Sequence, residues 1–267
     1  MNNQDFIFYG CRNIHEVIAA WRRKEVIVWE DFDETITEPD SATSWSILTH
    51  SGLMPEEFVE KRNILYDYYR KVERDLNKPQ VLRRKAMEEW YKMMLELLIE
   101  YKLSEIIIKE AVRRTDLMYF RGYGKELLSL GIPVIIVSAG IGNVIEEFLR
   151  FHGCLENVII IANYLYFEDG IVSGYSENII HSANKDEIIY PEKVQNLLMD
   201  RPNCIVIGDS IGDIKMIPKE NLEKAIKIGF LNNCIEKYLS RYTEHFDIVY
   251  TNGHSFGHII NLINNIK

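Results

Sequence analysis

The chain has 267 residues, of which 47% are hydrophobic and 27% are charged, a composition typical of globular proteins and not of disordered or fibrous ones. Forty acidic residues against 31 basic ones give a net charge of −9, which argues against a broad binding surface for nucleic acid. No apolar run reaches the roughly 18 residues of a membrane span. From the charge and the lack of such a run, we expect neither a nucleic-acid polymer nor a membrane as a partner.

Short runs of β-branched and other apolar residues recur along the chain, and such runs are typical of strands buried on both faces of a parallel sheet. In chain order the expected strands are Val26–Trp29, Pro133–Val137, Val158–Ile161, Cys204–Ile207, Ala225–Ile228 and a further candidate at Phe246–Tyr250. Helical patterns separate most of them, at Gly124–Leu130, Gly142–Phe151, Pro191–Met199, Cys234–Arg241 and Ser255–Ile266. This alternation predicts an α/β fold with a Rossmann-like, doubly wound parallel sheet.

A long, charged and helical stretch follows the first expected strand. It predicts an inserted helical domain at residues 40–121, with residues 1–39 and 122–267 forming the α/β catalytic core. Two helices are expected at residues 55–76 and 79–101, each beginning at a proline, which suits the first turn of a helix. We interpret their stripes of aromatic and apolar residues as packing between helices and not as a ligand cage: Phe58, Leu65, Tyr68 and Tyr69, and Met87, Trp90, Tyr91, Met94 and Leu97.

The segment from Asn163 to Gly174 has alternating apolar residues around Asp169-Gly170, which predicts a β-hairpin. The four cysteines form no C-x-x-C pair, and the first thirty residues lack a signal-peptide pattern. We therefore expect a location in a reducing cytoplasm and cysteines that behave as small buried hydrophobic residues, Cys204 above all.

Polar residues interrupt the apolar runs where ligands bind in open α/β sheets, beyond the carboxyl ends of the strands. The first run leads into Asp31-Phe-Asp33, and a loop there can turn both carboxylates toward one site. The second leads into Ser138-Ala139-Gly140, whose hydroxyl and backbone N–H groups can hold an anion at a helix start.

The fourth run leads into a second acidic pair, Asp209 and Asp213, in Gly208-Asp-Ser-Ile-Gly-Asp. Carboxylates from Asp31 and Asp209 suit Mg²⁺, and Lys185 can neutralise a phosphate oxygen. Taken singly, each motif is more often a turn, a helix cap or a surface lysine than part of a catalytic site. Their order and their places at strand ends together favour a catalytic site.

This order of motifs resembles the haloacid dehalogenase superfamily of aspartate-dependent phosphohydrolases. Within it, the stretch from Ser138 to Glu147, the segment Asn163 to Lys185, and Ile228-Gly-Phe-Leu-Asn232 are similar to the cytosolic pyrimidine 5′-nucleotidases. The resemblance covers most of the chain from Glu25 onward and is weaker in the helical insert, whose position agrees with that family's cap.

The resemblance implies a Mg²⁺-dependent phosphomonoester hydrolase that acts on a nucleoside 5′-monophosphate, preferably a pyrimidine one, through an aspartyl-phosphate. Asp31 would be the nucleophile and Asp33 the acid and base. Mg²⁺ would be held by the side chains of Asp31 and Asp209 and the main-chain carbonyl of Asp33, with Asp213 close by. Substrate contacts would come from Ser138, Ala139 and Lys185, and on the cap from Glu89 and Thr115, the latter standing where the family has serine.

Three alternatives stay open at this point. The same chemistry could act on another small phosphomonoester such as phosphoserine, a nucleoside could replace water as the phosphoryl acceptor, or the site could bind a nucleotide without turnover. His254 and His258 have the spacing of a two-histidine metal site on a helix, but no glutamate base or third ligand accompanies them, so ordinary surface or capping histidines are favoured.

Overall fold

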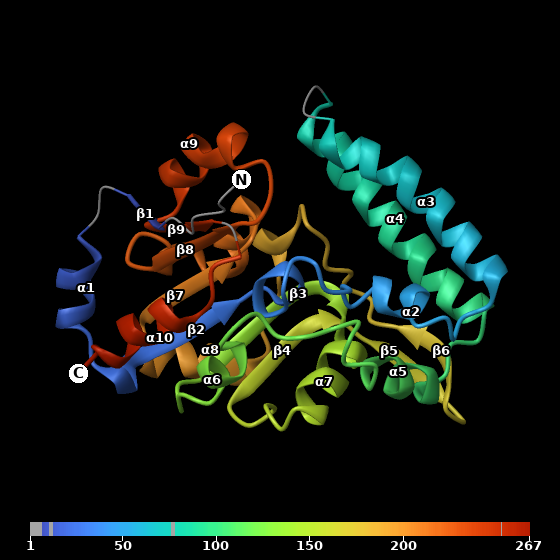
Figure 1. Ribbon diagram of the computed structural model, residues 1–267, viewed down its shortest axis with the longest axis horizontal. Helices are drawn as coiled ribbons and strands as arrows, with labels where there is room; N and C mark the ends of the chain where they lie inside the picture. Colours follow the sequence, from blue (N-terminus) through green and yellow to red (C-terminus); the bar gives the residue numbers. More distant parts are fainter. Residues whose placement is uncertain (1–6, 11–12, 76–77, 252) are drawn as a thin grey trace.

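The computed structural model describes residues 7–10, 13–75, 78–251 and 253–267. Within these residues lies a seven-stranded sheet in the order β1-β9-β8-β7-β2-β3-β4 (Figure 1). All neighbouring pairs are parallel except β1 and β9, which are antiparallel. The strands are β1 (Ile7–Tyr9), β2 (Val26–Glu30), β3 (Val134–Ile141), β4 (Val158–Asn163), β7 (Asn203–Gly208), β8 (Ile226–Leu231) and β9 (Ile248–Thr251).

The expected strands are confirmed, and the sequence analysis missed only β1 among the strands of this sheet that the structure describes. β3 runs past its expected end at Val137, through Ser138 to Ile141, with an irregularity in its pairing to β4. The expected hairpin is β5 (Leu165–Glu168) and β6 (Ile171–Tyr175). Asp169 and Gly170 have φ values of 50° and 75° at its turn, the left-handed conformation that a two-residue hairpin loop requires.

Helices cover both faces of the sheet, as a doubly wound fold requires (Figure 1). Along β2, Val26 and Val28 face one apolar cluster and Ile27 and Trp29 face another. The first cluster includes residues of α1 (Ile14–Ala20), α6 (Gly124–Leu128), α7 (Gly142–Phe151) and α10 (Gly257–Asn264). The opposite face is covered by α8 (Glu192–Asp200) and, over β8 and β9, by α9 (Ile235–His245).

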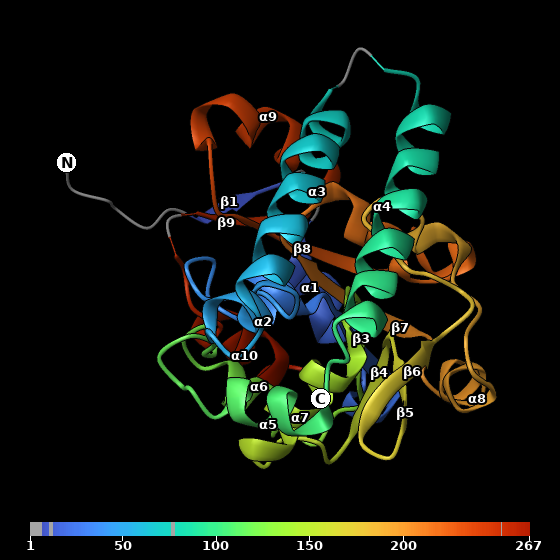
Figure 2. The ribbon, with the colours of Figure 1, turned by 90° about the vertical axis from the view of Figure 1, so that its right-hand side faces the viewer.

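Four α-helices that precede α6 follow β2 in the chain: α2 (Ser46–His50), α3 (Glu56–Arg74), α4 (Gln80–Glu100) and α5 (Glu105–Val112). α3 and α4 run side by side as a hairpin of helices (Figures 1 and 2). α5 packs against α7 of the core, so the apolar interior continues from the core into the insert. The division of the chain at residues 39/40 and 121/122 stays a prediction, as does the expected helix end at Leu76, which lies outside the described residues.

The packing interpretation of the stripes holds for Phe58, Tyr69 and Met87, which are buried. It is wrong for Tyr68, whose side chain is 63% exposed. An exposed aromatic ring beside a buried one is expected because Tyr68 and Tyr69 are consecutive in a helix and face different directions.

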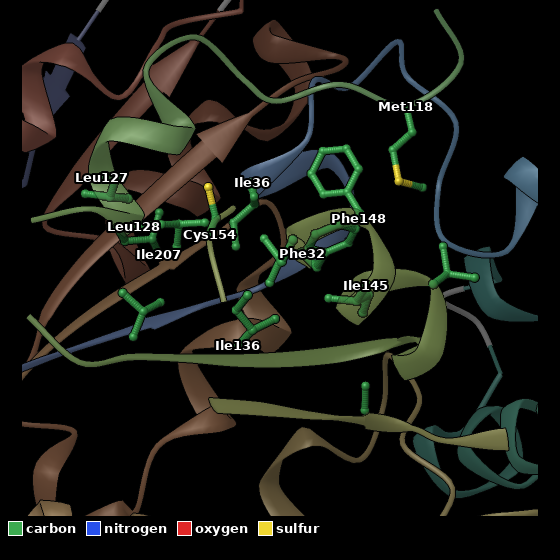
Figure 3. Close-up of a cluster of buried hydrophobic side chains, with 14 of the residues drawn as sticks. Phe32, Ile36, Met118, Leu127, Leu128, Ile136, Ile145, Phe148, Cys154 and Ile207 are labelled. Carbon is green, nitrogen blue, oxygen red and sulfur yellow. The ribbon is translucent and has the colours of Figure 1, made fainter. Parts of the chain in front are cut away.

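The loop after β2 is fixed by its own apolar residues. Phe32 and Ile36 are buried, and the ring of Phe32 meets Phe148 of α7 edge to face at 5.6 Å (Figure 3). Cys154 is buried in the same cluster, which Figure 3 shows around these rings. A rigid apolar base therefore supports the polar residues Asp31 and Asp33, which alternate with it along the chain.

Cys204 is buried on β7, as expected, whereas Cys234 is exposed before α9, so the expectation that the cysteines are buried is wrong for Cys234. Cys11 lies outside the described residues. Every helix that the structure describes is too short or too polar to cross a bilayer.

Candidate active site

Three neighbouring parallel strands bring the polar residues of three motifs to one edge of the sheet. β2 lies between β7 and β3, so the residues that follow it meet those of both neighbours. Asp31 follows β2, Asp209 follows β7, and Ser138 lies near the end of β3. The Asp31 N–H donates to the Ile207 carbonyl at 3.1 Å, which extends the strand pairing up to the acid. This edge is where ligands bind in open α/β sheets.

Lys185 joins the two acidic pairs. Its side chain is 5% exposed, and its Nζ donates to Asp31 Oδ1 at 2.5 Å, to Asp213 Oδ1 at 2.8 Å and to the Val137 carbonyl at 2.9 Å. These contacts use the three N–H bonds of the ammonium group. The structure therefore brings together three motif residues, Asp31, Lys185 and Asp213, which are up to 182 positions apart (213 − 31), as the order of the motifs predicts.

Asp33 is held by a residue that the sequence analysis did not identify. Its Oδ1 accepts from the Ser44 N–H and its Oδ2 from the Ser44 hydroxyl, both at 2.7 Å. Gly140 leaves room for this pair, because a Cβ there would lie 2.0 Å from Ser44 Oγ. Ser44 thus fixes both carboxylate oxygens of Asp33, and no sequence motif links the two residues.

The residue after Asp33 adopts a left-handed conformation, with φ of 60° at Glu34. Such a conformation is unfavourable outside glycine and persists only when its surroundings hold it. The fully buried Arg121 donates to the carbonyls of Glu34 at 2.7 Å and Thr35 at 2.8 Å, and Asn232 Nδ2 donates to the Glu34 carbonyl at 2.9 Å. These bonds, also missed from sequence, fix the direction in which the chain leaves Asp33.

The peptide group between Ala139 and Gly140 is held at both ends. Its carbonyl accepts from Trp45 Nε1 at 3.0 Å and Asn163 Nδ2 at 2.9 Å, and its N–H donates to Ser138 Oγ at 3.0 Å. Asn163 Nδ2 also donates to the carbonyl of Ile180, which belongs to the segment leading to Lys185. The turn expected to bind an anion is therefore rigid before any ligand arrives.

Asp31, Asp209 and Asp213 each offer an oxygen atom within 4.8 Å of the others, and among the residues that the structure describes this is the group suited to holding a metal ion. Gly208 permits the arrangement, since a Cβ there would lie 2.4 Å from the Asp213 Cβ. A set of carboxylate oxygens without nitrogen or sulfur suits a hard cation such as Mg²⁺. The carboxylate of Asp33 is directed to Ser44 instead; a contact from its main-chain carbonyl stays a prediction.

Burial is the main influence on the acids. It raises the pKa of Asp31 to about 7 against the lowering effect of Lys185, and it raises the pKa of Asp33 to about 6, a rise that the bonds from Ser44 limit. Burial and then the charge of Asp213 hold the pKa of Asp209 well above its usual range. Burial opposes the charge of Lys185, but the neighbouring carboxylates outweigh it and keep the pKa of this lysine above its usual range. A carboxyl that titrates near neutral pH, such as Asp33, suits proton transfer.

A cavity of about 400 Å³ opens above these residues, between the core and the helical hairpin α3–α4. Its floor is the acidic and basic cluster described above. Its wall is largely aromatic, with Trp45, Tyr66, Trp90, Tyr91 and Tyr242, and also carries Met94, Arg62, Arg70 and Glu73. The stripe on α4 therefore serves two purposes, because Trp90, Tyr91 and Met94 line the cavity as well as packing against neighbours.

The hairpin α3–α4 is also attached to the loop that leads to Lys185. Arg84 of α4 donates to the Ala183 carbonyl at 2.9 and 2.8 Å and to Asp186 Oδ1 at 2.8 Å. Ser182 Oγ donates to Glu73 Oε1 of α3 at 2.7 Å. The aromatic wall is thereby held over the acidic floor.

Two predicted substrate contacts lie elsewhere. Glu89 is exposed on α4 beside Tyr69, and Thr115 is exposed after α5. Neither is among the residues that line the cavity. Their assumed roles stay predictions, while Ser138, Ala139 and Lys185 do line it.

The His254 and His258 pair has other partners. His258 Nδ1 lies 2.5 Å from the Tyr250 hydroxyl, and the His254 carbonyl accepts from Arg121 at 3.1 Å. Within the described part of the chain these two histidines form no three-residue metal group. This arrangement is compatible with ordinary surface or capping histidines, the interpretation that the sequence favours.

Known proteins that are similar to this chain in sequence and in structure include 5′-nucleotidases. The sequence model of the pyrimidine 5′-nucleotidase family (UMPH-1) matches residues 37–267. A 7-methylguanosine phosphate-specific 5′-nucleotidase from Homo sapiens is 31% identical over 256 residues, which cover 88% of this chain and 84% of that protein.

Among solved structures, cytosolic 5′-nucleotidase IIIB bound to cytidine superposes with a TM-score of 0.84 at 28% identity, covering 99% of this chain and 94% of that one. A HAD family hydrolase from Salmonella enterica superposes with a TM-score of 0.60 at 14% identity, over 91% of this chain and 72% of that one, which is a likeness of fold alone.

Proposed function

Because the chain belongs to the pyrimidine 5′-nucleotidase family and is therefore a 5′-nucleotidase-type hydrolase, we propose that it is a Mg²⁺-dependent nucleoside 5′-monophosphate phosphohydrolase of the cytoplasm that prefers pyrimidine nucleotides. The observation that carries this proposal is the meeting of Asp31, Asp33 and Lys185 beneath an aromatic-walled cavity. Aromatic side chains provide a stacking surface for a nucleobase, and the charged floor provides for a phosphate.

The donor set fits the metal. Three carboxylates converge within 4.8 Å, and Asp31 and Asp209 would hold Mg²⁺ with Asp213 supporting them. When bound, Mg²⁺ neutralises charge on the nucleophile and the phosphate, which lets two anions approach each other.

Asp31 is the nucleophile in the proposed reaction. Its carboxylate oxygen forms a bond to phosphorus while the bond from phosphorus to the ribose 5′ oxygen breaks, and the product is an aspartyl-phosphate with a free nucleoside. Asp33 donates the proton that the leaving oxygen needs. Asp33 then accepts a proton from the water that attacks phosphorus, which releases phosphate and restores Asp31. The two bonds from Ser44 keep the carboxyl of Asp33 in reach of both oxygens.

The phosphate would be bound by the Ser138 hydroxyl, the backbone N–H of Ala139 and Lys185. Since all three N–H bonds of the lysine already have acceptors, a phosphate oxygen contacts it only by replacing one of them. We therefore assign Lys185 first to neutralising Asp31 and Asp213, and to phosphate binding as part of substrate entry.

The preference for pyrimidines is supported by the family to which the chain belongs, whereas the relative from Homo sapiens is specific for 7-methylguanosine phosphate. The two substrates differ in ring size and in charge, because 7-methylguanine carries a positive charge. The hairpin α3–α4, which forms the wall of the cavity, is the element that would distinguish them.

The test is phosphate release from a panel of UMP, CMP, GMP, 7-methyl-GMP and phosphoserine, with Mg²⁺ and with EDTA. Asp31→Asn should abolish release from every ester while the fold is retained. Asp169→Asn, at the exposed hairpin turn, is a matched control that should keep full activity, since asparagine tolerates the left-handed conformation there.

An active and folded Asp31→Asn variant would contradict the mechanism. Faster release from phosphoserine than from any nucleotide would contradict the substrate class, and binding of UMP without release in Mg²⁺ would identify a sensor instead of an enzyme.

A further inference from the structure

The aromatic wall of the cavity contains two buried N–H donors that lack acceptors. Within the described residues, neither Arg70 Nε on α3 nor Trp90 Nε1 on α4 has a hydrogen-bond partner, and both side chains line the cavity. A buried donor without an acceptor is unfavourable, so such groups in a ligand site indicate what the ligand supplies.

The two donors belong to one region of the wall. Tyr66, one turn before Arg70 on α3, meets the ring of Trp90 edge to face at 5.9 Å. Trp90 stacks on Tyr69 at 5.9 Å with an angle of 9° between the rings, which fixes the plane of its indole. Arg70 is bound through another guanidinium nitrogen to Glu73, which fixes its direction as well.

The chemistry of this region is one-sided. Both open positions are donors, and Arg70 carries a positive charge that is paired with Glu73. Cytosine offers O2 and N3, uracil offers O2 and O4, and guanine offers O6 and N7 as acceptors. Methylation at N7 removes one of the guanine acceptors and places a positive charge on the ring, which Arg70 would repel.

On the basis of the proposed function, we propose that Arg70 and Trp90 are specificity-determining residues that bind two acceptor atoms of a neutral nucleobase and select against 7-methylguanine. The nucleoside monophosphates of cytosine, uracil and unmodified guanine are then the substrate class of this site. On this proposal, the specificity for 7-methylguanosine phosphate that the name of the relative from Homo sapiens states would not extend to this chain.

The experiment compares kcat/KM for CMP, GMP, 7-methyl-GMP and ribose 5-phosphate, which lacks a base. Arg70→Met removes the charge and the donors while keeping the side-chain length, and Trp90→Phe keeps an aromatic ring while removing the N–H. Lys71→Met, which removes an exposed positive charge one residue further along α3, is the matched control.

Loss of a hydrogen bond from a charged donor corresponds to a decrease of about tenfold or more, and from a neutral donor to about fivefold. We expect decreases of this size for CMP in Arg70→Met and Trp90→Phe, and values within twofold of wild type for ribose 5-phosphate. The ratio of 7-methyl-GMP to GMP should be below 0.1 in the wild type, by order of magnitude, and should rise about tenfold in Arg70→Met.

An equal decrease for CMP and ribose 5-phosphate would overturn the inference, because Arg70 would then act on the phosphate. A wild type that prefers 7-methyl-GMP to GMP would also overturn it. Failure of the proposed function looks different, since no ester, including ribose 5-phosphate, would release phosphate.

Calorimetric binding of free nucleosides tests the inference independently of turnover. We expect cytidine to bind more tightly than 7-methylguanosine, and Arg70→Met to weaken cytidine binding about tenfold. Tighter binding of 7-methylguanosine, or unchanged binding of cytidine by a folded Arg70→Met variant, would refute the assignment.

Discussion

Replacing Asp31, the proposed nucleophile, with asparagine should make the metal-free protein more stable than the wild type at high pH. Asp31 is buried, and folding raises the pKa of its carboxyl from 3.8 to about 7. Between these two pH values the folded protein keeps a proton that the unfolded chain releases. The free energy of unfolding therefore falls as the pH rises through this interval, and the stabilising contribution of this carboxyl is fully lost above the folded pKa.

The size of the effect follows from that interval. Folding raises the pKa of Asp31 by roughly three units, and about two of these units lie within the range from pH 5 to pH 8. Each unit corresponds to about 1.4 kcal/mol. The wild type should therefore lose about 3 kcal/mol from this group alone over that range. Asparagine does not ionise, so Asp31→Asn should lack the loss.

Urea unfolding in EDTA at pH 5 and pH 8 measures the difference. Asp31→Asn should gain about 3 kcal/mol on the wild type between the two pH values, while Asp169→Asn should follow the wild type. Mg²⁺ should restore stability to the wild type at pH 8, because the cation binds the ionised carboxylates of the folded state. A difference between variant and wild type that stays constant with pH would refute the assignment of a raised pKa to Asp31.

Three other substitutions test the supporting contacts. Ser44→Ala removes a hydroxyl bond that lowers the pKa of Asp33, so this pKa should rise by about half to one unit. The alkaline limb of the pH profile of kcat/KM should move to higher pH by the same amount. An unmoved limb would argue against Asp33 as the acid. Gly208→Ala places a Cβ against Asp213, and titration with Mg²⁺ in the activity assay should show that the metal affinity is weaker by about tenfold or more. An unchanged affinity would argue against a place for Asp213 in the metal site. Arg84→Ala removes the bonds from α4 to the loop before Lys185, and steady-state kinetics should show KM raised about tenfold with kcat within a fewfold of wild type. A loss in kcat alone would contradict a role in holding the hairpin.

The core could be predicted because its strands have a strong local signal. Runs such as Val26–Trp29 are apolar on both faces, and only a buried parallel strand needs this pattern. β1 lacked such a signal, since it is a three-residue antiparallel edge strand with Tyr9 exposed. The lysine and the acids were found because each stands at a strand end or in the order that the motifs require.

The missed residues act through contacts that leave no pattern in the sequence. Ser44 reaches Asp33 across eleven residues, and Arg121 reaches Glu34 across 87. The role of Trp90 in the cavity was missed for another reason, because helical spacing shows that a face is covered but does not show whether protein or ligand covers it.

The central place of β2 in the sheet determines when the site can assemble during folding. Val28 pairs with Val134 and Ile205, which lie 106 and 177 residues further along (134 − 28 and 205 − 28). Pairings over such distances form slowly, and an unpaired apolar strand is prone to aggregate while it waits. The two helices of the hairpin α3–α4 pack against each other over a short separation in sequence, so this packing can form before β2 is enclosed. Asp31, the proposed nucleophile, is thus synthesised ahead of every other residue of its cluster but can meet all of them only after residue 213 has been made.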